Sequence, residues 1–312
     1  MSIRLDGRVA AITGAGAGLG RSHALLFASL GAKVVVNDLG ATLDGRGEAQ
    51  SAADAVVEEI KSQGGTAVAN HDSVADETGA RRIVQSAITQ FGRIDILVNN
   101  AGILRDKSFA KMETQDFLAV LAVHLHGGFH CCKAAWPHML EQKYGRIILT
   151  TSPSTNGNFG QSGYAAAKLG LIGMMNCLAL EGSKHDVLVN AISPGAVTRM
   201  TERVTPPHLL RYLRPELVSP AVAWLASEAC RISGQTIAAS AGGFSRVHAF
   251  ETRSVQFDPE LEITVDMIDE AFPRISDLSA AVAVQPGPLG DVEERLRSIG
   301  RLGVVGEGSS HG

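Results

Sequence analysis

The stretch Thr13-Gly14-Ala15-Gly16-Ala17-Gly18-Leu19-Gly20 decides the fold of this chain. It directly follows the apolar run Val9–Thr13 and opens an amphipathic segment, so it predicts a turn between a first strand and a first helix. Glycines at such a turn let the backbone approach a pyrophosphate, whose charge the N-terminus of the helix stabilises. The spacing G-x-G-x-x-G does not fit, whereas G-x-x-x-G-x-G does. The predicted phosphate-binding residues are Gly14, Gly16, Gly18, Leu19 and Gly20.

Short apolar runs alternate with amphipathic segments from Val9 to about Gly243. The runs predict strands at Val9–Thr13, Lys33–Asp38, Thr66–Asn70, Ile94–Asn99, Arg146–Thr151, Leu188–Ser193 and Gln235–Ala239. The segments between them predict helices at 49–62, 78–91, 114–141, 162–183 and 215–227. Strands that alternate with helices favour an α/β fold, here a doubly wound, seven-stranded parallel sheet with right-handed crossovers.

The composition changes after about Glu251. The remaining segment has no strong strand signal and two candidate helices, Val265–Phe272 and Asp291–Ile299, which the breaker Gln285–Gly290 separates. A segment of about sixty residues is too short for a convincing second core. We therefore predict one domain over residues 1–251 and a C-terminal helical extension over 252–312, which ends in a disordered stretch and lies over the main domain or a partner subunit.

Charge and composition exclude several classes of protein. The 28 basic and 32 acidic residues give a net charge of −4, so no general field attracts nucleic acid or an anionic membrane. The N-terminus lacks the apolar core of a signal peptide, and we find no apolar run long enough for a transmembrane helix. No spacing of cysteine and histidine resembles a metal site. We expect a cytoplasmic protein without a metal.

Acidic residues at the ends of two strands are candidates for binding an adenosine. Asp38 ends the second strand about 20 residues after the glycines, where a carboxylate accepts hydrogen bonds from both ribose hydroxyls. It would repel a 2′-phosphate, so it favours NAD(H) over NADP(H), although a capping role is the alternative. Asp72, beside Ser73 after the third strand, could reach the adenine amino group or cap the following turn. After the fourth strand, Asn100, Ala101 and Gly102 would cover the adenosine, with a purely structural role open for the asparagine.

Two residues four apart carry the predicted proton chemistry. Tyr164 and Lys168 lie on one face of a helix, where the ammonium is expected to lower the pKa of the phenol from its usual value of about 10. A tyrosine poised in this way exchanges a proton with a substrate oxygen while a hydride moves to or from the adjacent carbon. Ser152, at the end of the fifth strand, could hold that same oxygen.

These motifs, in this order, resemble those of the short-chain dehydrogenase/reductase family. The motifs are Thr13–Gly20, Asn99–Gly102, Ser152, Tyr164–Lys168 and Ser193–Gly195, and the resemblance covers about residues 6–250. It implies a Rossmann fold and a nicotinamide cofactor, with Tyr164 as acid/base, Lys168 on the nicotinamide ribose and Ser152 orienting the substrate. The resemblance also assigns the nicotinamide end of the cofactor to Pro194, Gly195, Val197 and Thr198.

Further stretches resemble one branch of that family, the (3R)-hydroxyacyl-CoA dehydrogenase unit of peroxisomal multifunctional β-oxidation enzymes, also called 17β-hydroxysteroid dehydrogenase type 4. These stretches are Val34–Gly40, Gly92–Asp95, Ala101–Asp106, Tyr144–Ile148 and Gly157–Gln161. The branch implies NAD-dependent oxidation of a (3R)-hydroxyacyl-CoA to the 3-oxoacyl-CoA. The alternatives are a 17β-hydroxysteroid or steroid side-chain CoA substrate, a 3-oxoacyl-acyl carrier protein reductase, and a non-catalytic dinucleotide-binding regulator.

The chain departs from the family pattern at two positions. His124 stands where many members have an asparagine in a proton relay, so either a relay or a structural histidine bonded to a backbone carbonyl is expected. Ser152 precedes Tyr164 by 12 residues instead of the commoner 13, which leaves Thr151 as the alternative catalytic hydroxyl.

The resemblance also leads to expectations about the substrate and about the oligomeric state. A small-molecule substrate of the acyl-CoA or steroid class is implied, and the basic residues Arg105, Lys107, Arg199 and Arg203 are candidates for contacting CoA phosphates. The loop Thr198–Leu213 is expected to form a lid over the substrate. The long helices at 114–141 and 162–183 form an interface in the family, so a homodimer or homotetramer is implied.

Overall fold

The computed structural model describes residues 3–40, 51–198, 205–284 and 292–301. The chain divides into two compact units, residues 1–247 and residues 248–312. The domain boundary that we predicted after residue 251 lies at the end of the short strand Phe250–Glu251, within the second unit.

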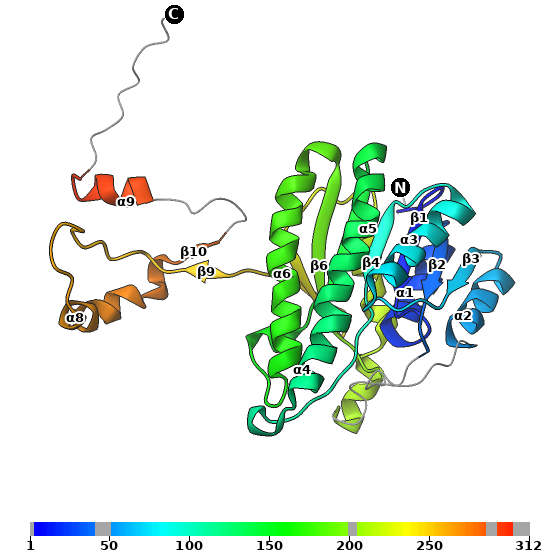
Figure 1. Cartoon of the computed structure of the whole chain (residues 1–312), viewed down its shortest axis with the longest axis horizontal. Helices are drawn as coiled ribbons and strands as arrows, with labels where there is room; N and C mark the ends of the chain where they lie inside the picture. The colour runs from blue at the N-terminus through cyan, green and yellow to red at the C-terminus, as the bar shows by residue number, and fades with distance from the viewer. Residues whose placement is uncertain (1–2, 41–50, 199–204, 285–291, 302–312) are drawn as a thin grey trace, which may run out of the picture. The chain divides into compact units, whose positions relative to one another are not determined.

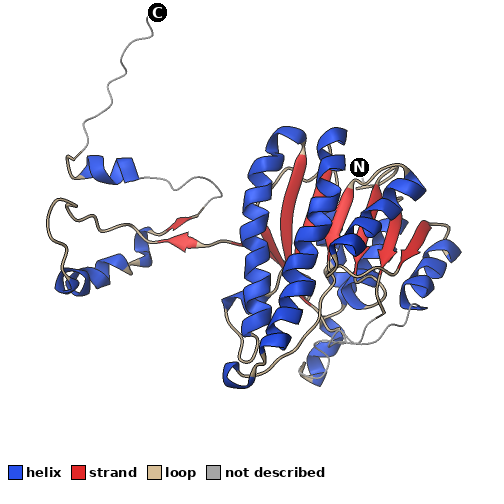
Figure 2. Cartoon of the chain, in the orientation of Figure 1, coloured by secondary structure: helices blue, strands red, loops and turns tan. Residues whose placement is uncertain are grey.

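The first unit is built around one sheet (Figures 1 and 2). Its strands are β1 (Val9–Thr13), β2 (Lys33–Asn37), β3 (Thr66–Asn70), β4 (Ile96–Asn99), β5 (Gly145–Thr150), β6 (Val187–Gly195), β7 (Thr236–Ser240) and β8 (Gly243–Val247). They lie in the order β3-β2-β1-β4-β5-β6-β7-β8, and β1 to β7 are parallel to one another. The chain winds outward in both directions from the pair β1 and β4, which confirms the doubly wound prediction. Such a reversal opens a crevice at the carboxyl ends of these strands.

The predicted sheet lacked the eighth strand. β8 runs antiparallel to β7 and follows it after a two-residue turn, in which Ala241 (φ 50°) and Gly242 (φ 80°) both have positive φ. That geometry matches the right-handed twist of a hairpin. All five residues of β8 are exposed, so the strand lacks the apolar alternation by which sequence reveals strands.

Helices cover both faces of the sheet (Figure 1). The first cluster of buried side chains includes Phe27 and Val222, and it lies beneath α1 (Gly18–Ser29), α2 (Ser51–Ser62) and α7 (Ser219–Ala226). The second includes Ile83 and Leu171, and it lies beneath α3 (Glu77–Phe91), α5 (Gly127–Gln142) and α6 (Ser162–Gly182). Neighbouring residues of a strand point to opposite clusters, as Ala11 and Ile12 do.

The helix predicted at 114–141 contains a widened turn. Helix α4 (Thr114–Leu121) continues through a π-helical turn, Ala122–His126, into α5. Such turns are rare within α-helices and frequently mark functional sites. Here the turn carries the buried side chain of His124.

Among the described residues, one helical stretch, Ser162–His185, is long and apolar enough to cross a membrane by length and composition alone. The expectation that the chain holds no such stretch is therefore wrong on this criterion. The stretch begins with α6, which packs along β6 and against α4. Since core helices of soluble proteins pass the same test, this finding is weak evidence for a membrane span.

An ionic cluster joins the amino ends of the central strands. The fully buried Asp95 accepts hydrogen bonds from the backbone N–H of Val9 (3.0 Å) and from the guanidinium groups of Arg8 (3.0 Å) and Arg93 (2.6 Å). Arg8 also lies over the ring of Tyr144, 3.6 Å from its centroid. We call Arg8, Arg93, Asp95 and Tyr144 the amino-end cluster.

A buried histidine on α1 makes stability depend on pH. Nδ1 of His23 lies 2.8 Å from the hydroxyl of Ser219 on α7, and burial lowers the pKa of His23 from 6.5 to about 3. The unfolded chain binds this proton below about pH 6.5 whereas the folded chain does not, so stability is lost as the pH falls from 6.5 towards 3. At about 1.4 kcal/mol per pH unit, the expected loss at pH 5 is about 2 kcal/mol.

This expectation is tested by urea unfolding of the wild type and of His23→Asn at pH 7 and pH 5. The variant should lose about 2 kcal/mol less than the wild type over this interval. His124 titrates in the same direction in both proteins, so it cancels in the comparison. An equal loss in the two proteins would show that His23 is not responsible.

The second unit contains a small sheet and two helices. β9 (Phe250–Glu251) pairs antiparallel with β10 (Val282–Ala283), and neither strand was predicted. Helices α8 (Val265–Ile275) and α9 (Val292–Ser298) lie where the sequence predicted helices. The predicted breaker at 285–290 and the predicted disordered end lie outside the described residues.

Candidate active site

Two glycines of the turn have no room for a Cβ. Gly14 has φ +63°, and a Cβ there would lie 2.8 Å from the Cα of Ala101. A Cβ on Gly20 would lie 2.2 Å from the carbonyl oxygen of Gly14. The Asn100 side chain donates to the carbonyls of Thr13 (2.9 Å) and Gly14 (3.0 Å), so it holds the turn from the end of β4. Helix α1 begins at Gly18 and directs its N-terminus at this turn.

The carboxylate of Asp38 lies against the turn. Its Oδ2 accepts from the N–H of Gly16 at 2.8 Å, and its Oδ1 accepts from the N–H of Gly40 at 2.7 Å. A Cβ on Gly16 would lie 2.8 Å from Oδ2, so only glycine admits this approach. Each carboxylate oxygen can accept a second hydrogen bond. The arrangement fits the adenosine ribose and pyrophosphate of a dinucleotide.

The residues after β3 are bonded to their neighbours on β3 and α3 and to each other. Asp72 accepts from Arg82 at 2.6 Å and from the Asn70 side chain at 2.8 Å. The hydroxyl of Ser73 accepts from the N–H of Ala75 at 3.2 Å. Helix α3 is capped by Asp76 and not by Asp72, whose side chain accepts only from side chains in these contacts. Contact of Asp72 with adenine stays a prediction.

The predicted nicotinamide-end residues follow β6 or end it. The methyl carbon of Thr198 would lie 3.3 Å from a Cβ on Gly18, so this threonine borders the phosphate-binding turn. Gly195 accepts from the hydroxyl of Ser240 at 3.0 Å through its carbonyl oxygen. Val197 donates its N–H to the carbonyl of Leu213. Residues 199–204, most of the first half of the predicted lid, lie outside the described part of the chain.

The predicted catalytic side chains meet at the carboxyl end of β5. Burial raises the pKa of Tyr164, while a hydrogen bond with the Ser152 side chain acts to lower it. The ammonium of Lys168 lies 5.6 Å from the centroid of the Tyr164 ring and donates to the carbonyl of Thr150 at 2.5 Å. Thr151 is buried and donates to the backbone carbonyl of Lys168, so Ser152 is the hydroxyl that faces the tyrosine.

The electrostatics of this pair correct one expectation. Burial raises the pKa of Tyr164 above its usual value of 10, and the carboxylate of Asp106 raises it further. The predicted lowering of this pKa by Lys168 is not found, and the one cause that lowers it is the hydrogen bond with Ser152. Burial also lowers the pKa of Lys168 to about 7, because its ammonium is removed from water. Burial therefore disfavours the charged forms of both side chains, the phenolate of Tyr164 and the ammonium of Lys168.

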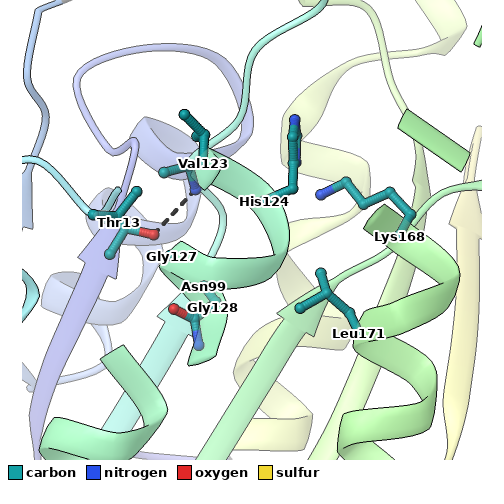
Figure 3. A pocket seen from close by; sticks show the side chains of 10 residues that line it. Thr13, Asn99, Val123, His124, Gly127, Gly128, Lys168 and Leu171 are labelled. Atoms are coloured by element: carbon teal, nitrogen blue, oxygen red, sulfur yellow. Dashed lines mark hydrogen bonds between the residues drawn. The ribbon is translucent and has the colours of Figure 1, made fainter. Parts of the chain in front are cut away.

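His124 lines a small cavity beside Lys168 (Figure 3). Its Nε2 lies 2.8 Å from the carbonyl oxygen of Ile103, and its ring meets the Tyr164 ring edge-on, with centroids 5.0 Å apart. Its Nδ1 is buried without a hydrogen-bond partner among the described residues. Burial holds the pKa of His124 well below its ordinary value, so the ring is neutral. The carbonyl contact is the one expected of a structural histidine, and a relay role stays a prediction.

Two of the four candidate basic residues are bonded to a carboxylate. Arg105 and Lys107 contact Asp116 at 3.1 Å and 2.8 Å. A CoA phosphate would therefore compete with this carboxylate for both of them. Arg199 and Arg203 lie outside the described residues. No group of histidine, cysteine, aspartate and glutamate suited to a metal ion occurs in the part of the chain that the structure describes.

Sequence reasoning missed Gln161. Its side chain contacts three other side chains beside Ser152 and Tyr164. The stretch Gly157–Gln161 carried part of the family resemblance, but a single sequence cannot show which loops a glutamine joins.

Comparison with known proteins gives the family. Residues 8–208 match the family model described as short chain dehydrogenase. The chain belongs to this family. As a short-chain dehydrogenase it is an oxidoreductase that uses a nicotinamide dinucleotide.

Two multifunctional enzymes are similar in sequence. The peroxisomal multifunctional enzyme type 2 of Drosophila melanogaster is 48% identical over 306 residues, which are 96% of this chain and 51% of that enzyme. The peroxisomal hydratase-dehydrogenase-epimerase of Saccharomyces cerevisiae is 52% identical over 254 residues, which are 81% of this chain and 28% of that enzyme. The chain thus spans about half of the first enzyme and less of the second.

Two solved structures are similar to this chain in fold. The full-length Drosophila enzyme superposes with a TM-score of 0.77 at 41% identity, over 95% of this chain and 49% of that one. A 7α-hydroxysteroid dehydrogenase, solved with NADH and 7-oxo glycochenodeoxycholic acid, superposes with a TM-score of 0.69 at 33% identity. That match covers 77% of this chain and 95% of the other.

Proposed function

We propose that this protein oxidises (3R)-hydroxyacyl-CoA to 3-oxoacyl-CoA with NAD. The observation that carries the proposal is the meeting of Ser152, Tyr164 and Lys168 at the same sheet edge as the glycine turn with Asp38. The similarity to two peroxisomal multifunctional enzymes supports an acyl-CoA substrate.

The chemistry of the site follows from these side chains. A bound NAD would supply the hydride acceptor for the carbinol carbon. Tyr164 removes the hydroxyl proton of the substrate, and Ser152 donates a hydrogen bond to the same oxygen. Tyr164 must start as the phenolate in this direction and becomes a phenol when it takes the proton, and the nearby Lys168 ammonium would stabilise that phenolate. Lys168 would also orient the nicotinamide ribose, and Asp38 would hold the adenosine ribose.

A steroid substrate is the second candidate, either a 17β-hydroxysteroid or a steroid side-chain CoA. The similarity in fold to a 7α-hydroxysteroid dehydrogenase favours it. Reduction of 3-oxoacyl groups on acyl carrier protein would use the same side chains in the reverse direction. A non-catalytic dinucleotide-binding regulator is disfavoured because Ser152, Tyr164 and Lys168 are all present and adjacent.

A homodimer or homotetramer is also proposed. Leu169 and Leu180 on α6 and Phe129 on α5 are each about half exposed. An exposed apolar face of this kind marks an interaction surface. Sedimentation velocity at micromolar concentration should show a dimer or tetramer.

Steady-state rates test the proposed reaction. Purified protein is assayed with NAD and with NADP across 3-hydroxyacyl-CoA esters of increasing chain length and 17β-hydroxysteroids. The proposal expects the highest kcat/KM with NAD and a (3R)-hydroxyacyl-CoA. Preference for a steroid would favour the second candidate, and cofactor binding without oxidation of any alcohol would favour the regulator.

Replacing Asp38 with alanine is expected to change the choice of cofactor. The variant loses a charged acceptor for the ribose hydroxyls, and the loss of even one such hydrogen bond costs about 1.5–3 kcal/mol, so KM for NAD should rise by at least about 10-fold. The repulsion of a 2′-phosphate also disappears, so the ratio of kcat/KM for NAD to that for NADP should fall. Asp269→Ala, an exposed aspartate on α8, is the matched control. An unchanged ratio in Asp38→Ala would assign this carboxylate to capping alone.

A further inference from the structure

Two loops flank the catalytic hydroxyl and tyrosine, and both are poorly packed. Residues 153–161 follow Ser152, and none of them is buried; Phe159 is 89% exposed. In the loop 103–108, only Ile103 is buried. Since apolar packing does not fix these loops, hydrogen bonds must determine where they lie.

Gln161 makes the side-chain bonds that join the two loops. Its Oε1 accepts from the hydroxyl of Ser154 at 2.7 Å and from Nδ2 of Asn158 at 3.0 Å. Its Nε2 donates to Oδ2 of Asp106, in the other loop, at 2.7 Å. A carboxylate can only accept, so this bond fixes the orientation of the amide.

Gln161 is linked to both catalytic groups, to the serine through Ser154 and to the tyrosine through its own backbone. The backbone N–H of Ser154 donates to the hydroxyl oxygen of Ser152 at 3.1 Å, so Gln161 is one residue removed from the catalytic serine. On the other side, Gln161 directly precedes α6, and its carbonyl accepts from the N–H of Ala165 at 2.7 Å in the turn that carries Tyr164. The N–H of Lys107 donates to the carbonyl of Gly160 at 3.0 Å, which ties the loops once more at the backbone.

We propose that Gln161 is a positioning residue that holds the Ser152 hydroxyl and the Tyr164 phenol at their mutual distance by joining the loops 153–161 and 103–108. The proposal rests on the proposed dehydrogenase function and concerns only how its site is assembled. A displacement of about 1 Å between reacting groups can cost about 100-fold in rate, so loosening these loops should affect kcat. The glycine turn and Asp38 belong to other segments, so cofactor binding should not change.

Gln161→Leu removes all three side-chain bonds and keeps similar bulk. We expect kcat to fall by about 10- to 100-fold, with the Kd for NADH, measured by fluorescence, unchanged within about twofold. Gln85→Leu is the matched control, because the side chain of Gln85 on α3 donates to Thr89 in its own helix, and it should retain wild-type kcat.

A reversed pair tests whether the bond to Asp106 matters. Gln161→Glu places two carboxylates at the position of a 2.7 Å hydrogen bond, so kcat should fall as in Gln161→Leu. Adding Asp106→Asn restores the bond with donor and acceptor exchanged, and it leaves an oxygen on residue 161 to accept from Ser154 and Asn158. This double variant should recover at least tenfold in kcat over Gln161→Glu, which a loss of general stability would not allow.

A third comparison asks whether Gln161 acts through the serine. In a Ser152→Ala background, Gln161→Leu should cost less than a third of the factor that it costs in the wild type, because the group that it positions is gone. Equal factors in the two backgrounds, wild-type kcat in Gln161→Leu, or no recovery by the reversed pair would each overturn the proposal. A wild type that oxidises no alcohol would overturn the proposed function and this inference together, whereas an active wild type isolates the role of Gln161.

Discussion

Tyr164→Phe is expected to lower kcat/KM by about three orders of magnitude, the middle of the range for removing a general acid or base. The phenol hydroxyl is the only group lost, and the ring that meets His124 edge-on remains. The site then has no acceptor for the substrate proton, although Ser152 can still bind the oxygen. NADH binding should stay within about twofold of the wild type, because the glycine turn and Asp38 are untouched. Stopped-flow hydride transfer and NADH fluorescence measure the two quantities.

The matched control for this variant is Tyr144→Phe. Tyr144 is also buried, but it belongs to the amino-end cluster, where its hydroxyl lies 3.5 Å from the carbonyl oxygen of Ala226. Its kcat/KM should equal that of the wild type. A Tyr164→Phe enzyme that retained more than a tenth of wild-type activity would show that another group moves the proton.

Asp95→Ala is expected to lower the free energy of unfolding by about 3 kcal/mol, the range found when one partner of a buried charged network is removed. Asp95 is fully buried and bonded to Arg8, Arg93 and the N–H of Val9. The variant leaves that N–H without its acceptor and removes the carboxylate that lies between the two guanidinium groups, although Glu228 still pairs with Arg8. Because Arg8 and Arg93 are partly exposed, water reduces this cost below that of a fully enclosed pair.

Guanidinium unfolding at pH 7 measures this loss, with Glu228→Ala as the control. Glu228 also bonds to Arg8, but its side chain is 71% exposed, so its removal should cost less than about 1 kcal/mol. Equal losses in the two variants would mean that burial of Asp95 contributes nothing. The kcat of Asp95→Ala, measured where it is folded, should match the wild type.

Much of the first unit could be predicted because short-range patterns determine it. The apolar run Val9–Thr13, the glycines after it and the alternation of runs and amphipathic segments are local features that specify a doubly wound sheet. The structure confirms this sheet, in which the direction of winding reverses between β1 and β4. Strand β8 escaped prediction because none of its side chains is buried, so no hydrophobic pattern reveals it.

The site could be predicted in its residue types but not in its contacts. The sequence predicted that Ser152, Tyr164 and Lys168 share a site, and the structure places them together. It could not show that desolvation would raise the pKa of Tyr164, since burial depends on the packed neighbours. It also could not show that Gln161 reaches Asp106, because that bond joins two loops far apart in the chain.

The amino-end cluster has a practical consequence. The charged side chains of this cluster lie at the amino ends of β1 and β4. The contacts of the candidate active site lie at the carboxyl ends of β1, β4 and β5, a full strand length away. Substitutions at distant, unshared sites act additively. Heat tolerance and turnover can therefore be engineered separately in this enzyme, by altering opposite rims of the same sheet.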